Sequence, residues 1–301
     1  MKKDPTVNLQ KNVLLAPLTT YKIGGIADLF MAVQSSSELM EAIKYAQENN
    51  LTYFVLGTGA NILVGDDGFR GLVIHNLANH YAIDGSSLYA ESGAVLEELI
   101  AYTAKNGLSG LEHFAGIPSS VGGALRQNLH FLSPDRKSTI FIGGIVESAT
   151  ILDKDNTIKK VGKDYFEFGY DYSILHTKPV VVLDATFSLK PARHENIARQ
   201  IQDNLAWRND KQPQLSDVPS CGSVFKKIEN LGAGRLIEKA GLKGTRAGGA
   251  MISPKHANYI VNMGGATAKD VLALIAHVQT TVLEKTGNQL EPEISFIGDF
   301  E

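Results

Sequence analysis

The spacing of apolar residues along this chain is typical of short helices and short strands. Ser35 and Glu38 have the separation of an N-terminal helix-capping pair. Leu39, Ile43 and Ala46 follow on one face of the helix that this pair would start. Similar patterns predict further helices at about 95–105, 194–207 and 267–286, strands at 53–57, 145–152, 157–161 and 179–189, and a hairpin at about 81–92.

One segment, 108–128, fits no regular element, because glycines, serines and a proline interrupt it. Such a composition is typical of loops and short helical turns that lie against a ligand. Composition changes again near residue 190, ahead of the helix at 194–207, and we place a domain boundary there.

The overall composition is that of an ordinary globular protein. Of 301 residues 44% are hydrophobic and 20% charged, and this length favours two or three compact units. A net charge of −3 argues against nucleic acid as a partner. Cys221 is the single cysteine, so no intrachain disulfide forms, and no stretch approaches the ~20 apolar residues of a membrane span. The opening segment, 1–12, lacks the apolar run of a secretory signal, so we expect a cytoplasmic protein without membrane contact.

Two glycine-rich segments are candidate cofactor loops. GTGAN at 57–61 offers successive backbone N–H groups to a pyrophosphate, although a tight surface turn explains it equally well. It is not a dinucleotide fingerprint, because Ile62 stands where the third glycine belongs. GIPSSVGG at 116–123 is a second such loop, and the two together favour a nucleotide cofactor without identifying it.

Two late segments carry groups that can move a proton. In PSCGSVFKKIE, 219–229, Ser223 lies between a glycine and two lysines, and Glu293 belongs to LEPE at 290–293. Brought together, a hydroxyl and a carboxylate can handle protons on an anionic substrate. Taken singly, each residue has a simpler explanation. The segment of Ser223 is also typical of the start of a strand, and Glu293 is also typical of a solvated strand residue.

Six segments carry a family resemblance in order along nearly the whole chain. They are TTYKIGG (19–25), LGTGANILVGDDGFRGLVI (56–74), GIPSSVGGALRQN (116–128), KQPQLSDVPSCGSVFKK (211–227), AGLKGTRAGGAMISPKHANYIVN (240–262) and LEPEISFIG (290–298). These resemble the motifs of the UDP-N-acetylenolpyruvoylglucosamine reductase family, flavoenzymes of peptidoglycan precursor synthesis. The resemblance implies an α+β fold, with a two-subdomain FAD-binding module of the vanillyl-alcohol-oxidase type at 1–75 and 76–190. A substrate-binding α+β domain would follow at 191–301, with Glu293 on its C-terminal strand.

The resemblance also implies a reaction. In the family NADPH reduces FAD, and hydride then passes to the double bond of a UDP-sugar, UDP-N-acetylglucosamine enolpyruvate, giving UDP-N-acetylmuramate. Ser223 matches the proton donor and Glu293 the carboxylate that assists it. No histidine lies in 57–71, where covalent relatives attach their flavin, so FAD is expected to be non-covalent. We expect a monomer without a metal ion.

Other residues are expected to bind cofactor and substrate. Flavin contacts are expected from Gly57, Thr58, Gly59, Ala60, Asn61, Ile62, Gly116, Ile117, Pro118, Ser120, Gly122, Gly123 and Asn128. Substrate contacts are expected from Tyr170, Lys211, Lys226, His256 and Asn258. The short spacing from Tyr170 to Lys211 is similar to that of the shorter, second type of the family.

The chain departs from the family pattern close to the expected site. Asp171, in FGYDYS, stands where the family has an active-site arginine, and the segment 128–141 is longer than usual. We hypothesise that Arg126 supplies the missing positive charge near Glu293. A structural arginine that pairs with Asp135 or faces solvent is an equal alternative.

His130 and Arg136, in the longer segment, are weaker candidates for the same role. Two other functions stay open. One is a flavin oxidase or dehydrogenase of the same fold with another substrate, and the other is a catalytically silent nucleotide-binding protein. Retention of both Ser223 and Glu293 weighs against the silent alternative.

Overall fold

The computed structural model describes residues 9–228 and 231–300, so the first eight residues of the opening segment and Glu229 lie outside the described part. The chain divides into two compact units. Unit 1 contains residues 31–58 and 73–207, and unit 2 contains residues 10–30, 59–72, 208–228 and 231–300. Each unit has a hydrophobic core.

Unit 1 is organised around a five-stranded antiparallel sheet with the order β12-β11-β13-β7-β6. Its strands are β6 Tyr81–Asp84, β7 Ser87–Glu91, β11 Val146–Leu152, β12 Ile158–Gly162 and β13 Val181–Ser188. The predicted hairpin is present, with Asp84 opposite Ser87 and Gly85 at a φ of +58° in the turn. Four further strands predicted at 145–152, 157–161, 179–189 and 53–57 are also confirmed.

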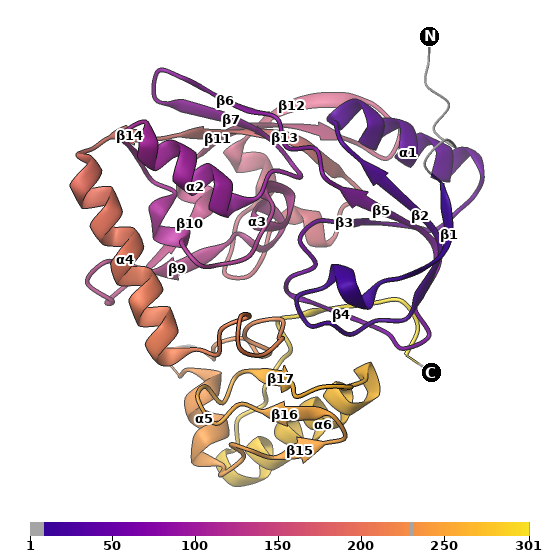
Figure 1. The fold of residues 1–301 in the computed structure, drawn as a ribbon, viewed down its shortest axis with the longest axis vertical. Coiled ribbons are helices and arrows are strands. Elements are labelled where there is room, and N and C mark those ends of the chain that lie inside the picture. The colour runs from indigo at the N-terminus through magenta and orange to yellow at the C-terminus, as the bar shows by residue number, and fades with distance from the viewer. Residues whose placement is uncertain (1–8, 229–230, 301) are drawn as a thin grey trace. The chain divides into compact units, whose positions relative to one another are not determined.

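Helices cover one face of this sheet (Figure 1). Leu99 of α2, Leu96–Lys105, and Leu125 of α3, Val121–Gln127, are fully buried in one core with Ala185 of β13. The longer α4, His194–Lys211, begins in unit 1 and carries Arg208 into unit 2. Among the residues that the structure describes, no helix is both long and apolar enough to cross a membrane.

The predicted helix caps are confirmed. Ser35 caps α1, Ser36–Glu48, by accepting a hydrogen bond from the Glu38 N–H at 3.2 Å. Thr267 and Asp270 form a complete capping box at the start of α6, Ala268–Thr286. Reciprocal bonds of this kind satisfy backbone donors that a helix leaves unpaired.

A second sheet has the order β1-β2-β5-β3. Its strands are β1 Gln10–Leu14, β2 Ile26–Val33, β3 Tyr53–Leu56 and β5 Phe69–Asn76. The sequence suggested that β3 is buried, but only Leu56 is, and Tyr53, Phe54 and Val55 are half-buried. The reason is its place at the edge of the sheet, where a strand has a neighbour on one side only.

Unit 2 packs α5, Ala233–Lys239, and α6 with a three-stranded sheet, β15-β16-β17. These strands are Arg246–Ala247, Ala250–Ile252 and Ile260–Asn262. The last strand, β18 Ser295–Ile297, pairs in parallel with β4, Ile62–Val64. Glu293 was expected on this strand but precedes it. The segment around Pro292 instead bridges Phe225 in the antiparallel sense, so the chain changes partner before β18 begins.

Short elements complete the chain. They are η2 Ala16–Leu18, β8 Leu108–Ser109, η3 Glu112–Phe114, β9 His130–Leu132, β10 Thr139–Phe141, η4 Ile142–Gly144, η5 Lys163–Phe166, η6 Ile174–His176 and β14 Lys190–Pro191. The segment 108–128 consists of loops, η3 and the single short helix α3, as predicted.

Candidate active site

The start of the first glycine-rich loop lies against Ser120, in the middle of the second, in unit 1. A Cβ built on Gly57 would lie 2.4 Å from the Oγ of Ser120 and 3.3 Å from its Cβ. Ser120 is the N-cap of α3, and its Oγ accepts a hydrogen bond from the Gly123 N–H at 3.3 Å. His75 contributes a hydrogen bond to the Gly57 backbone. Only glycine permits this approach, so position 57 exposes main chain where another residue would place a side chain.

The second loop is fixed by its own backbone. Gly122 N–H donates to Ser92 O at 2.8 Å, and Val121 N–H donates to Ala94 O at 2.9 Å. Gly116 and Gly123 are exposed, whereas Ser119 and Ser120 are buried. The open side of the loop is therefore largely main chain.

These loops fit a flavin nucleotide by their chemistry. Neither GTGAN (57–61) nor GIPSSVGG (116–123) contains a carboxylate that would repel a pyrophosphate. Exposed main-chain groups in glycine-rich loops are typical anion-binding elements. In unit 2, Ala60 and Asn61 are half-buried and Ile62 is buried in β4, so Ile62 offers a ligand main chain rather than side chain.

Asn128 is buried and its amide bonds to protein backbone. Its Nδ2 donates to Gly169 O at 2.8 Å and its Oδ1 accepts from the Gly143 N–H at 3.1 Å. It also ends α3 with a φ of +46°, a conformation that asparagine tolerates. These contacts position the end of α3, and a direct flavin contact by Asn128 remains a prediction.

In unit 2 the segment that follows Ser223 is clamped by Asn258. The Val224 N–H donates to Asn258 O at 2.8 Å. The Asn258 side chain also bonds both backbone groups of Phe225, at 3.0 Å to its N–H and 2.9 Å to its C=O. Asn258 was predicted to contact substrate, and the structure gives it this supporting role.

The C-terminal segment with Glu291 and Glu293 pairs with residues 224–226 on the side away from Asn258. The Glu293 N–H donates to Val224 O at 2.8 Å, and the Lys226 N–H donates to Glu291 O at 2.9 Å. Residues 223–226 therefore lie between the Asn258 and Glu293 segments. The chain brings Ser223 and Glu293 into one neighbourhood, as the sequence suggested.

Two residues that sequence reasoning missed complete this neighbourhood. The phenol of Tyr259 lies near both Ser223 and the guanidinium of Arg208 and interacts with each of them. Burial raises the pKa of Tyr259, which the charge of Arg208 opposes, and burial also lowers the pKa of Arg208. Both residues lie in or beside matched motifs, Tyr259 directly after KHAN and Arg208 shortly before Lys211.

The lysines predicted to bind substrate lie in exposed ion pairs. Lys226 Nζ contacts Glu291 Oε1, and Lys211 Nζ lies 2.7 Å from Asp210 Oδ2. His256 is half-buried, and burial, followed by the charge of Lys243, lowers its pKa. Its Nδ1 accepts the Asn258 N–H at 3.3 Å, which orients the ring.

The two features predicted to depart from the family pattern, Asp171 and the segment 128–141, meet in unit 1. His130, from the longer segment, places its Nδ1 3.4 Å from Oδ1 of Asp171, whose side chain is fully buried. The His130 ring also lies 4.7 Å from that of Tyr170 and 5.3 Å from that of Phe141. Asp171 has a φ of +51°, which aspartate tolerates better than longer side chains do. The changed residue and the changed segment thus form one packed cluster.

The candidate cations of this region have structural contacts. The Arg126 guanidinium donates to Leu175 O at 2.6 Å. Asp135 accepts from Ser133 Oγ at 2.6 Å. Arg136 lies 5.5 Å from the ring centre of Trp207, so its guanidinium is engaged in cation–π packing.

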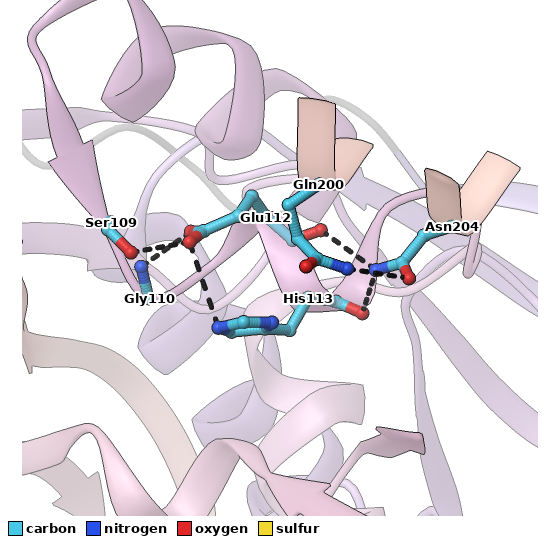
Figure 2. A network of polar contacts seen from close by, with 6 residues as sticks. All are labelled: Ser109, Gly110, Glu112, His113, Gln200 and Asn204. Carbon is cyan, nitrogen blue, oxygen red and sulfur yellow. Dashed lines mark hydrogen bonds and ion pairs between the residues drawn. The ribbon is translucent and has the colours of Figure 1, made fainter. Parts of the chain in front are cut away.

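Figure 2 shows a polar network beside the second loop. Buried Glu112 accepts hydrogen bonds from Ser109 Oγ and the Gly110 N–H, and its Oε1 lies 3.7 Å from His113 Nε2. Asn204 of α4 donates to the carbonyls of Glu112 and His113 at 3.3 and 3.0 Å. Because η3 leads into residues 116–123, α4 holds the loop through these bonds.

Asn204→Ala is expected to lower the free energy of unfolding by about 1–3 kcal/mol, because one buried and one part-buried carbonyl lose their donor. Thermal unfolding measures the change. Gln202→Ala, an exposed position on the same helix, is the matched control and should unfold like the unchanged protein. Equal unfolding temperatures for the two variants would contradict the supporting role of Asn204.

Comparisons with known proteins show the family of this chain. The profile of the FAD binding domain family matches residues 27–162, and that of the UDP-N-acetylenolpyruvoylglucosamine reductase C-terminal domain matches residues 212–297. UDP-N-acetylenolpyruvoylglucosamine reductase of Clostridium novyi is 39% identical, with 97% of this chain and 92% of that protein covered. The Listeria innocua enzyme of the same name is 38% identical, with 98% and 97% covered.

A solved structure is similar as well. The crystal structure of UDP-N-acetylenolpyruvylglucosamine reductase from Thermus caldophilus is 33% identical, with a TM-score of 0.80 and 96% of this chain and 99% of that chain covered. These matches confirm the expected α+β fold and its FAD-binding module.

Proposed function

Because the chain belongs to the UDP-N-acetylenolpyruvoylglucosamine reductase family, we propose that it reduces UDP-N-acetylglucosamine enolpyruvate to UDP-N-acetylmuramate. The observation that carries this proposal is the shared neighbourhood of Ser223 and Glu293 in unit 2. FAD, when bound, supplies the hydride carrier between NADPH and the enolpyruvyl double bond. The residues that would hold it are the main-chain groups of 57–62 and 116–123.

Ser223 would supply the proton. Hydride addition to a double bond beside a carboxylate leaves negative charge on the neighbouring carbon and its carboxylate. A carbon so charged is basic enough to take a proton from a hydroxyl, which is otherwise a weak acid. Glu293 is proposed to assist at the same centre, because its backbone is bonded beside Ser223 at Val224.

Lys211 and Lys226 would bind the anionic groups of the substrate. Their ion pairs with Asp210 and Glu291 lie at the surface, with 57% and 37% of the lysine side chains exposed. Exposed ion pairs contribute only about 0–1 kcal/mol, so phosphate or carboxylate groups can replace the present partners at little cost. Tyr170, His256 and Asn258 remain proposed substrate contacts on the strength of the family motifs.

We also propose that the protein acts as a monomer in the cytoplasm. The lone cysteine, Cys221, supports this placement, because it is buried and forms no disulfide. Burial raises the pKa of the Cys221 thiol, so the thiol stays protonated and unreactive.

Arg126 is proposed to supply positive charge to the substrate carboxylate, in place of the arginine that Asp171 replaces. Arg126→Ala should then slow turnover about tenfold, the cost of one lost hydrogen bond to a charged group. Arg126→Lys, which keeps the charge, should retain part of the turnover that Arg126→Ala loses. Steady-state assays measure both variants, and near-normal turnover of Arg126→Ala would refute the replacement.

Bound flavin gives the test of the proposed function. Purified protein should show flavin absorbance that NADPH bleaches without oxygen, and adding UDP-N-acetylglucosamine enolpyruvate should restore the oxidised spectrum. Recovery only on adding oxygen would indicate an oxidase instead. A protein that binds no flavin would indicate the catalytically silent alternative.

A further inference from the structure

We propose that Tyr259, supported by Arg208, positions Ser223 and returns the proton that Ser223 gives up; this inference rests on the proposed function. Tyr259 contacts Ser223 rather than the reacting atoms, so it is a positioning residue. Arg208 acts one step further out, through Tyr259.

The backbone around Tyr259 is held firmly. Its N–H donates to His256 O at 3.0 Å, and its C=O accepts from the Ser253 N–H at 2.8 Å. The ring is 5% exposed and packs edge-on against His256 at a centroid distance of 5.0 Å. A phenol fixed in this way can hold a hydroxyl in one orientation.

The Ser223 side of the contact is held as firmly. Val224 bonds to Asn258 O through its N–H and to the Glu293 N–H through its C=O, both at 2.8 Å. Asn258 directly precedes Tyr259, so the same segment that carries the phenol also clamps the residue after Ser223. The backbone pairing of Val224 with Asn258 therefore holds Ser223 and Tyr259 close to each other.

The relative acidities of the two hydroxyl groups favour proton transfer from Tyr259 to Ser223. When the Ser223 hydroxyl proton bonds to the substrate carbon, the electron pair of the O–H bond stays on Oγ. A phenol, with an ordinary pKa of about 10, is a stronger acid than an aliphatic hydroxyl and can reprotonate Oγ. The positive charge of Arg208 stabilises the resulting phenolate, which then takes a proton from water.

The titratable groups that face Tyr259 come from three elements. The charged groups are Arg208 on α4 and Glu293 before β18, and the third group is the protonated, uncharged thiol of Cys221 near Ser223. Burial raises the pKa of Tyr259, so the phenol is protonated at neutral pH and ready to donate. His256, which packs on the ring, has a pKa lowered chiefly by burial and is neutral there.

Tyr259→Phe tests the inference, because it removes only the phenol oxygen. Reduction of the flavin by NADPH and the KM for the enolpyruvyl substrate should not change. Reoxidation of the flavin by that substrate should slow about tenfold or more, since the hydroxyl loses its orientation and its proton source. The solvent deuterium isotope effect on this step should increase.

Tyr21→Phe is the matched control. Tyr21 is also a fully buried tyrosine of unit 2, and its phenol lies near the Cys221 thiol instead of Ser223. In Tyr21→Phe, the substrate should reoxidise the flavin at the normal rate. Arg208→Lys, which keeps a charge beside the phenol, should retain more activity than Arg208→Met.

Two outcomes would overturn the inference. If Ser223→Ala reoxidises slowly while Tyr259→Phe behaves normally, Ser223 acts alone and only this inference fails. If Tyr259→Phe raises KM and leaves kcat unchanged, Tyr259 binds substrate instead of positioning Ser223. Normal reoxidation in Ser223→Ala would instead refute the proposed role of Ser223 itself.

Discussion

Ser223→Ala is expected to leave the reduction of the flavin by NADPH intact and to slow its reoxidation by the enolpyruvyl substrate about 10²- to 10⁴-fold. That range is what a positioned acid ordinarily contributes. The proton would then have to come from solvent, which lacks the backbone support that fixes the segment of Ser223. Anaerobic stopped-flow absorbance at the flavin band separates the two half-reactions.

The control for this variant is Ser220→Ala. Ser220 is 2% exposed and lies in the same segment, where it bridges Val261 and makes no contact with Tyr259 that the described residues record. Both the reduction and the reoxidation of the flavin should proceed at normal rates in Ser220→Ala. If Ser223→Ala slowed bleaching by NADPH instead, the serine would serve flavin binding and not proton transfer.

Gly57→Ala is expected to weaken FAD binding about tenfold or more. The new methyl group would lie 2.4 Å from Ser120 Oγ, and moving that hydroxyl breaks the cap of α3. Overpacking of this kind costs about 1–3 kcal/mol, and 1.4 kcal/mol is tenfold in affinity. Titration of the apoprotein with FAD, followed by flavin fluorescence, measures the change.

Two further variants isolate the cause. Gly162→Ala adds a methyl group to a glycine with no atom within 4 Å of the new Cβ, so FAD affinity should not change. Ser120→Gly combined with Gly57→Ala removes both atoms of the clash and should bind FAD better than Gly57→Ala alone. A double variant no better than Gly57→Ala would mean that the contact with Ser120 is not the cause.

Local sequence patterns predicted most of the regular structure. The capping box of Thr267 and Asp270 starts α6 where expected, because a cap acts over a single turn of helix. The burial of β3 was overestimated, because its place at a sheet edge depends on strands distant in the sequence. Glu293 was assigned to the last strand for the same reason, since its partner, Val224, is remote.

The site was predictable where a motif carried it. Ser223 and Glu293 stood out by residue type and Gly57 and Ser120 by their glycine-rich loops, whereas the contact of Gly57 with Ser120 appears only in the structure. Arg208 and Tyr259 were missed although they lie in or beside motifs, because no local pattern indicates their roles and only tertiary packing brings them to Ser223.

The cluster of His130 and Asp171 was missed for a related reason. The longer segment and the changed residue were each recognised as departures, but their contact joins residues far apart in the chain. Arg126, which lies close in sequence to the second loop, therefore received the role of compensating cation before His130. The Arg126 variants test whether Arg126 is the compensating cation.

Glu293 is anchored immediately on both sides. Its own N–H is tied to Val224 O at 2.8 Å, and the N–H of Ser295 is tied to Asn61 O at 3.0 Å. An inserted or deleted residue between these anchors would break one of them and turn the carboxylate elsewhere. Descendants of this gene can therefore change side chains around the acid more freely than they can change the length of the tail.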